Sequence, residues 1–104
     1  MLSGRMNPVQ VIENRSDVSG RVTDVLPHPT LPNHSLVRMQ VQDVAPVEGF
    51  ANLFDSFRGQ TIDVALGGER ARKLELRPGD SISARIRRAG PTSVFAEDNT
   101  VARE

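Results

Sequence analysis

The chain has 104 residues and contains no cysteine, no tryptophan, no tyrosine and no long hydrophobic run. Without cysteine it can form no disulfide, no thiolate metal site and no thiol nucleophile. Without an apolar run of about 18 residues it has no candidate transmembrane helix, and its first residues lack the hydrophobic segment of a secretion signal. We therefore expect a single-domain cytoplasmic protein that does not insert into membranes.

The chain also lacks net charge, because 13 basic residues balance 13 acidic ones. A protein whose main role is nonspecific binding of nucleic acid or anionic membranes normally carries an excess of positive charge. The balance still permits a local basic patch. Lys73 is the only lysine, so such a patch would consist mainly of arginines, whose planar guanidinium groups can bind anions in bidentate geometry.

Motifs that carry catalytic chemistry are missing as well. The only histidines, His28 and His34, lie in a proline-rich loop and do not have the spacing of a helical zinc site. No P-loop, dinucleotide fingerprint or G-x-S-x-G motif occurs. The spacing of the carboxylates near predicted strands does not pair them for acid–base chemistry. We therefore expect no catalytic residue, no metal site and no cofactor, and we predict that the protein is not an enzyme.

Alternating apolar and polar residues are the main pattern that is present. Val37, Met39 and Val41 alternate with polar side chains, which indicates a strand with one buried face. An earlier segment is rich in β-branched residues and contains Gly20, and a glycine inside a strand often marks a bulge or a bend. Together these patterns predict five strands, within residues 17–26, 35–44, 59–68, 81–88 and 93–97.

One segment changes to a helical period. Phe50, Leu53, Phe54 and Phe57 follow the i, i+3, i+4, i+7 spacing, which predicts a short helix between the second and third strands. Its apolar stripe would either cap the core or dock a partner. Good helix formers at residues 69–76 allow a helical turn between the third and fourth strands.

Short, closely spaced strands favour a small antiparallel barrel over a parallel α/β sheet. We predict an all-β fold, a five-stranded OB-like antiparallel barrel, because five strands with one tucked helix suit that architecture. Residues 17–97 would form the barrel, residues 1–16 a flexible leader and residues 98–104 a flexible tail.

Two stretches resemble the TOBE or Mop domains, which accompany transporter ATPases or bind molybdate and related oxyanions. They are "DVSGRVTDV" at residues 17–25 and residues 69–96, which contain the turn "LELRPGD" and a strand ending in Ile86 and Arg87. The resemblance implies an OB-type barrel. It also implies oxyanion contacts at Arg15 and Arg87, although Glu13 stands where that family has a serine. A shorter stretch, "VSGRVTDVLPHP", is similar to the opening of tRNA-binding OB domains.

The segment from residue 69 to residue 88 is locally basic, with seven positive and three negative residues. It supports two hypotheses for a non-catalytic binding or accessory module, and the helix supports a third. The first is contact with a small anion or a larger transport protein through Arg15, Arg85 and Arg87. The second is binding of RNA or single-stranded DNA through Arg38, Arg85, Arg87, Arg88 and Phe95, and the third is protein association through the helix at residues 50–57. The arginines could equally protect a strand edge and maintain solubility.

Overall fold

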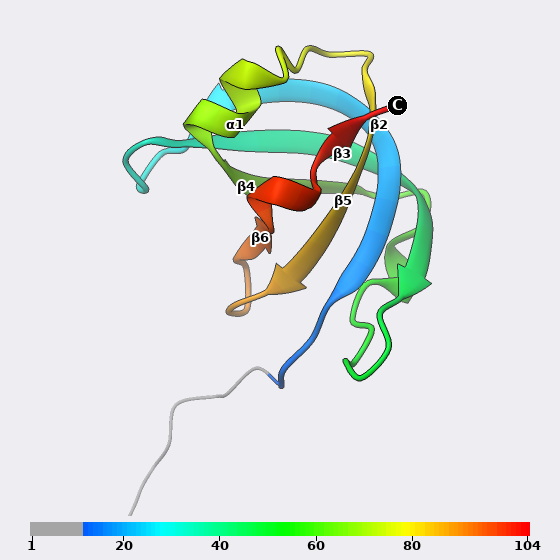
Figure 1. The fold of residues 1–104 in the computed structure, drawn as a ribbon. Coiled ribbons are helices and arrows are strands. Elements are labelled where there is room, and N and C mark those ends of the chain that lie inside the picture. The colour runs from blue at the N-terminus through cyan, green and yellow to red at the C-terminus, as the bar shows by residue number, and fades with distance from the viewer. Residues whose placement is uncertain (1–11) are drawn as a thin grey trace, which may run out of the picture.

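A computed structural model describes residues 12–104, which form a closed five-stranded barrel (Figure 1). The strand order is β2-β3-β4-β6-β5, and β5 pairs back with β2 to close the barrel. All neighbours are antiparallel except β4 and β6, which meet in parallel at Ala65 and Phe95. The structure thus confirms the predicted all-β, OB-like barrel. Its strands are β2 (Ser16–Pro27), β3 (His34–Pro46), β4 (Thr61–Gly67), β5 (Ser81–Arg88) and β6 (Val94–Ala96).

The barrel interior is filled by the side chains that the alternating pattern predicted. Val37, Met39 and Val41 of β3 are each at most 2% exposed, and Ile86 of β5 is fully buried. Burial of a Val, Ile, Leu or Met side chain stabilises a fold by about 1.5–3 kcal/mol. A core made almost entirely of aliphatic residues therefore holds the five strands together.

Gly20 lies beside a β-bulge, as a glycine in mid-strand predicted, although the extra residue is on the neighbouring strand. The register between β2 and β3 shifts beside Gly20, because Gln42 on β3 has no partner on β2. A Cβ atom at Gly20 would overlap the carbonyl oxygen of Gln40 and approach the Met39 side chain. The strands can approach this closely only because residue 20 has no side chain.

A second register shift gives the barrel an internal repeat. The tetrapeptide V-x-D-V occurs at residues 22–25 and again at residues 41–44. In both copies the second residue, Thr23 or Gln42, is the extra residue of a β-bulge. Such a bulge bends a strand and increases its twist, so the two copies help β2 and β3 curve around the barrel.

The region between β3 and β4 corrects the predicted helix. Only Asp55–Phe57 are helical there, as a single 3-10 turn, η1, whereas residues 50–54 form an irregular loop. Three of the four apolar residues nevertheless belong to the core: Phe54 is fully buried, and the partly buried Leu53 and Phe57 pack against it. The segment therefore caps the core.

The α-helix lies instead between β4 and β5. This helix, α1 (Gly68–Lys73), covers the end of the barrel opposite to the one at which β2 begins (Figure 1). Its one buried residue is Ala71, which lies in the core cluster. None of the helices formed by residues 12–104 is long and apolar enough to cross a membrane.

The last residues are also ordered, which corrects the expectation of a flexible tail. A 3-10 turn, η2 (Asp98–Thr100), leads to Val101, which is 1% exposed, and then to β7 (Ala102–Arg103), which pairs with β5. At the other end, residues 1–11 of the predicted leader lie outside the described residues. The rest of that leader is anchored, because Asn14 and Ser16 are buried.

Candidate anion-binding site

Three of the predicted site residues line one hollow at the end of the barrel where β2 begins. This hollow has a volume of about 300 Å³, and we call it the arginine hollow. Arg15 comes from the segment that leads into β2, whereas Arg87 and Arg88 come from the end of β5. The other lining residues are Ile12, Glu13 and Asn14.

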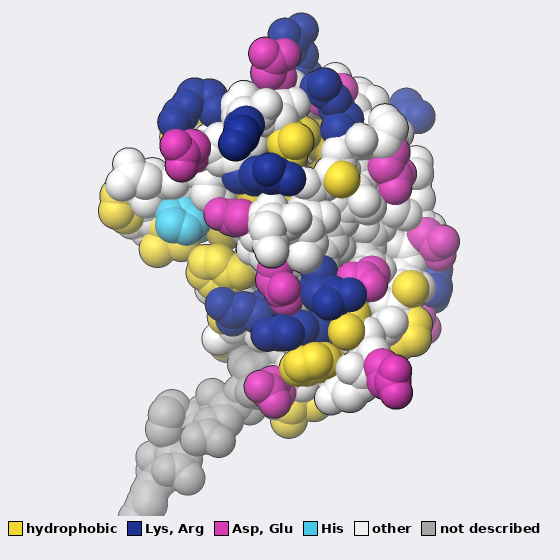
Figure 2. All heavy atoms as spheres, viewed as in Figure 1, with side chains coloured by type: hydrophobic (Ala, Val, Ile, Leu, Met, Phe, Trp, Pro, Cys, Tyr) yellow, Lys and Arg dark blue, Asp and Glu magenta, His cyan; other side chains and the backbone are white. Residues whose placement is uncertain are grey.

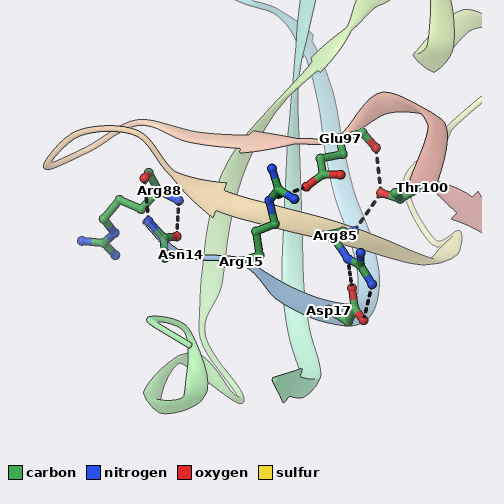
Figure 3. A network of polar contacts seen from close by, with 7 residues as sticks. All are labelled: Asn14, Arg15, Asp17, Arg85, Arg88, Glu97 and Thr100. Carbon is green, nitrogen blue, oxygen red and sulfur yellow. Dashed lines mark hydrogen bonds and ion pairs between the residues drawn. The ribbon is translucent and has the colours of Figure 1, made fainter. Parts of the chain in front are cut away.

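Asn14 fixes this arrangement (Figure 3). It is 4% exposed, and its side-chain Nδ2 donates hydrogen bonds to the Arg88 carbonyl at 2.9 Å and to the Ile12 carbonyl at 2.8 Å. Its Oδ1 accepts a hydrogen bond from the Arg88 backbone N–H at 2.8 Å. The amide thus pairs with β5 as another strand residue would, and it holds Arg88 beside the leading segment. Sequence reasoning missed Asn14 because its partner lies 74 residues away.

Arg85 is bound to an acidic partner on the neighbouring strand. Its Nε and NH2 groups donate to the two carboxylate oxygens of Asp17 at 2.9 and 3.2 Å, across directly opposed positions of β5 and β2 (Figure 3). These hydrogen bonds, together with the charge of Asp17, raise the pKa of Arg85 above its usual value. The bidentate pair joins the strands that close the barrel, and its charges compensate each other.

Arg38 lies apart from the arginine hollow, on β3, and forms the same kind of pair. It contacts Asp63, its directly opposed residue on β4, at 2.8 and 3.2 Å. The hydrogen bonds to Asp63, and then its charge, raise the pKa of Arg38. Of the predicted site residues, Arg38 and Arg85 therefore have structural partners in the sheet.

Arg15 is partly compensated. Its Nε lies 3.1 Å from Glu97 Oε2, an ion-pair distance, although the contact lacks hydrogen-bond geometry (Figure 3). Its guanidinium carbon lies 4.5 Å from the centroid of the Phe50 ring. The two contacts hold the Arg15 side chain in place, and Arg15 also lines the arginine hollow.

Arg87 and Arg88 form no ion pair within residues 12–104. Arg88 continues the alternation of inward-facing residues along β5. Its guanidinium lies 5.6 Å from the ring centroid of Phe54 and 5.5 Å from that of Phe57. Its Nε is buried and lacks a hydrogen-bond partner in this part of the chain. Arg87 is exposed, and its guanidinium lies 5.3 Å from the centroid of the Phe95 ring.

The electrostatic balance at the arginine hollow is positive by one charge. Arg15, Arg87 and Arg88 face two carboxylates, Glu13 in the lining and Glu97 beside Arg15. Figure 2 shows Lys and Arg side chains gathered with Asp and Glu side chains on the lower part of the displayed face, next to hydrophobic side chains. The site can therefore attract an anion without being strongly basic.

Phe95 lines a second hollow, of about 360 Å³, which we call the loop hollow. It lies between the loop after β2 and the turn before β6, over the outer face of β3 and β4. Its apolar lining residues are Leu31, Leu36, Ala65, Val94 and Phe95.

His28 stands at the polar rim of the loop hollow. Its Nδ1 accepts hydrogen bonds from the backbone N–H groups of Thr30 at 3.1 Å and Leu31 at 3.0 Å. The neutral ring therefore carries its proton on Nε2, which remains a donor. His34 lies outside the loop hollow, and its Nδ1 is 2.9 Å from the Pro32 carbonyl. No group of three or more potential metal-ligating side chains occurs among residues 12–104.

Comparisons with known proteins assign this chain to no family. No protein-family model matches it. A search of curated proteins finds no significant match either. The resemblance to TOBE or Mop domains therefore stays a prediction, whereas the OB-like barrel rests on the strand order and closure described above.

Proposed function

We propose that the protein is a non-catalytic binding module that holds an anion in the arginine hollow. The observation that carries this proposal is the presence of Arg15, Arg87 and Arg88 in the lining of one hollow, where the last two form no ion pair with the described residues. Guanidinium groups bind phosphate and carboxylate oxygens through paired N–H donors.

Binding fits this site better than catalysis. Arginine stays protonated at accessible pH, so it can orient and neutralise an anion but cannot act as a general base. Glu13 is the one carboxylate in the lining of the arginine hollow. The single surplus positive charge favours a small anion of low charge and modest affinity.

The test is a titration of the full chain with phosphate, sulfate and molybdate at low ionic strength, followed by backbone amide NMR. We expect saturable shifts at residues 12–15 and 87–88. Arg87→Gln should weaken binding about tenfold or more, since a hydrogen bond to a charged group contributes about 1.5–3 kcal/mol.

Arg21→Gln is the matched control. It removes the same charge from an exposed position on β2 that does not line the arginine hollow. The proposal is wrong if no anion binds at low ionic strength. It is also wrong if Arg21→Gln weakens binding as much as Arg87→Gln, since that would mean a diffuse charge effect.

A further inference from the structure

The arginine hollow and the loop hollow are connected by a cross-strand pair. Arg87 on β5 and Phe95 on β6 are directly opposed in the register, and the Arg87 guanidinium lies 5.3 Å from the ring centroid. Arg87 lines the arginine hollow and Phe95 lines the loop hollow. A ligand with an anionic end and a flat apolar part could therefore contact both.

The loop hollow has the chemistry to hold a ring. Its lining combines Phe95 and aliphatic residues with Thr30, Thr92 and Ser93. Asp63 also lines it, and its carboxylate is paired with Arg38. His28 adds an Nε2–H donor, because its Nδ1 is occupied by two backbone N–H groups. An aromatic platform with a few polar groups at its edge is typical of sites that bind planar heterocycles.

We infer that the two hollows hold a single nucleotide unit, with its phosphate in the arginine hollow and its base in the loop hollow against Phe95. The inference rests on the proposed anion site and adds the class of the ligand. Base stacking on an aromatic side chain contributes whichever base is present, because every base has a π-face. The unit could be a free nucleotide or part of a single strand, since both present the same base and phosphate.

The first experiment compares ligands that share a phosphate. The full chain is titrated with inorganic phosphate, ribose 5-phosphate, nucleoside 5′-monophosphates and a short single-stranded deoxythymidine oligomer at low salt. We expect the monophosphates to bind at least about fivefold more tightly than phosphate or ribose 5-phosphate, because only they supply a base to stack. The oligomer identifies the source: tighter binding by the oligomer indicates a strand, and equal binding indicates a free nucleotide.

The second experiment removes the stacking ring. Phe95→Leu keeps an apolar side chain on β6, and thermal unfolding verifies that the variant folds. We expect this variant to lose the advantage of the monophosphates over inorganic phosphate. The readout is the ratio of the two affinities, because Phe95 also contacts Arg87 of the anion site. Arg87→Gln should instead weaken binding of all these ligands.

The outcomes separate this inference from the proposed function. If phosphate binds but nucleotides bind no better, or if Phe95→Leu leaves the nucleotide advantage intact, the nucleotide inference is wrong and the anion site stands. Equal binding of ribose 5-phosphate and the monophosphates overturns it in the same way, because the base then adds nothing. If neither phosphate nor nucleotide binds, both proposals are wrong.

Discussion

The two V-x-D-V segments have the same backbone arrangement in different surroundings. Val22 exchanges two backbone hydrogen bonds with Gly79 and Asp80, and Val41 exchanges two with Gly59 and Gln60. In each copy the bulge comes directly after this valine. Beyond the bulge, β2 extends past the first residue of β5, and β3 extends past the first residue of β4. There the aspartate of the motif accepts the N–H of the next valine, at 2.9 Å for Val25 and 3.1 Å for Val44.

The two segments differ in what faces and covers them. Gly20 lies beside the bulge at Gln42, whereas Arg38 and Met39 lie opposite the bulge at Thr23. Arg58 also donates a hydrogen bond to the Val44 carbonyl, and no side chain among residues 12–104 does so at Val25. The comparison teaches that a local motif can set the backbone while tertiary neighbours decide how much room remains and how the strand edge is covered.

The largest expected effect distinguishes the two bulges by crowding. Gly20→Ala should destabilise the protein by about 3 kcal/mol, because the new Cβ would overlap the Gln40 carbonyl and neither backbone can move aside cheaply. Urea unfolding measures the change. Gly90→Ala is the control, since its Cβ would meet only ordinary contacts. A loss below about 1 kcal/mol for Gly20→Ala would show that the strands adapt there.

Truncation of the valine that precedes each bulge should affect both copies equally. Val22 and Val41 are 1% and 0% exposed, so alanine at either position should cost about 2 kcal/mol through two lost buried methyl groups and the cavity they leave. The same urea unfolding measurements apply. Unequal losses would contradict the equivalence of the two copies in the core.

The glycines that pair with these valines provide a purely backbone comparison. Gly59 and Gly79 have φ angles of 83° and 97°, and a Cβ at either position would meet no neighbouring atom. Alanine at either position should therefore cost about 1–2 kcal/mol from conformational strain alone. Crystal structures and unfolding of both variants would check this, and a neutral Gly79→Ala would show that its turn relaxes.

The smallest expected effect concerns the aspartates. Asp24→Ala and Asp43→Ala should each lower the free energy of unfolding by about 1 kcal/mol. Each substitution removes the carboxylate that accepts the N–H of the next valine, where β2 has passed the end of β5 or β3 the end of β4. Asn at the same positions keeps an acceptor oxygen and should recover most of the loss. Amide hydrogen exchange at Val25 and Val44 measures the effect directly. Unchanged exchange in the alanine variants would mean that water replaces the carboxylate without cost.

The strands were predictable because their signal is local. Alternation in β3, β4 and β5 follows directly from one buried face, and the core contains the residues that this pattern indicates. The prediction of a helix at residues 50–57 was wrong, because apolar residues with this spacing can be buried either by a helix or by an irregular loop. Long-range contacts decide between them: Asn14 forms a β-bridge with Ala51, and the Asn52 side chain accepts a hydrogen bond from Ser16. The same Asn52 oxygen also accepts the nearby Phe54 N–H.

The candidate site was predictable only in part. The arginines of β5 could be seen in the sequence, but the partner of Arg85 lies 68 residues away on β2. The order of residues 98–104 was also missed, because Val101 is a single apolar residue without a repeating pattern around it. The contact between Arg85 and Asp17 depends on which residues of the two strands lie opposite each other, and the closed barrel sets that register.

The sequence by itself determined the number of barrel strands, their inward faces and a bulge or bend near Gly20, because each depends on side-chain size or on a period of two residues. Only the tertiary structure decided which arginines are bound by carboxylates and which line a hollow. Barrel closure by β2 and β5 places Asp17 opposite Arg85, the pairing of β3 and β4 places Asp63 opposite Arg38, and the pairing of β5 and β6 leaves Arg87 beside Phe95. Charge compensation acts through space, so the availability of an arginine for a ligand depends on where the chain folds back.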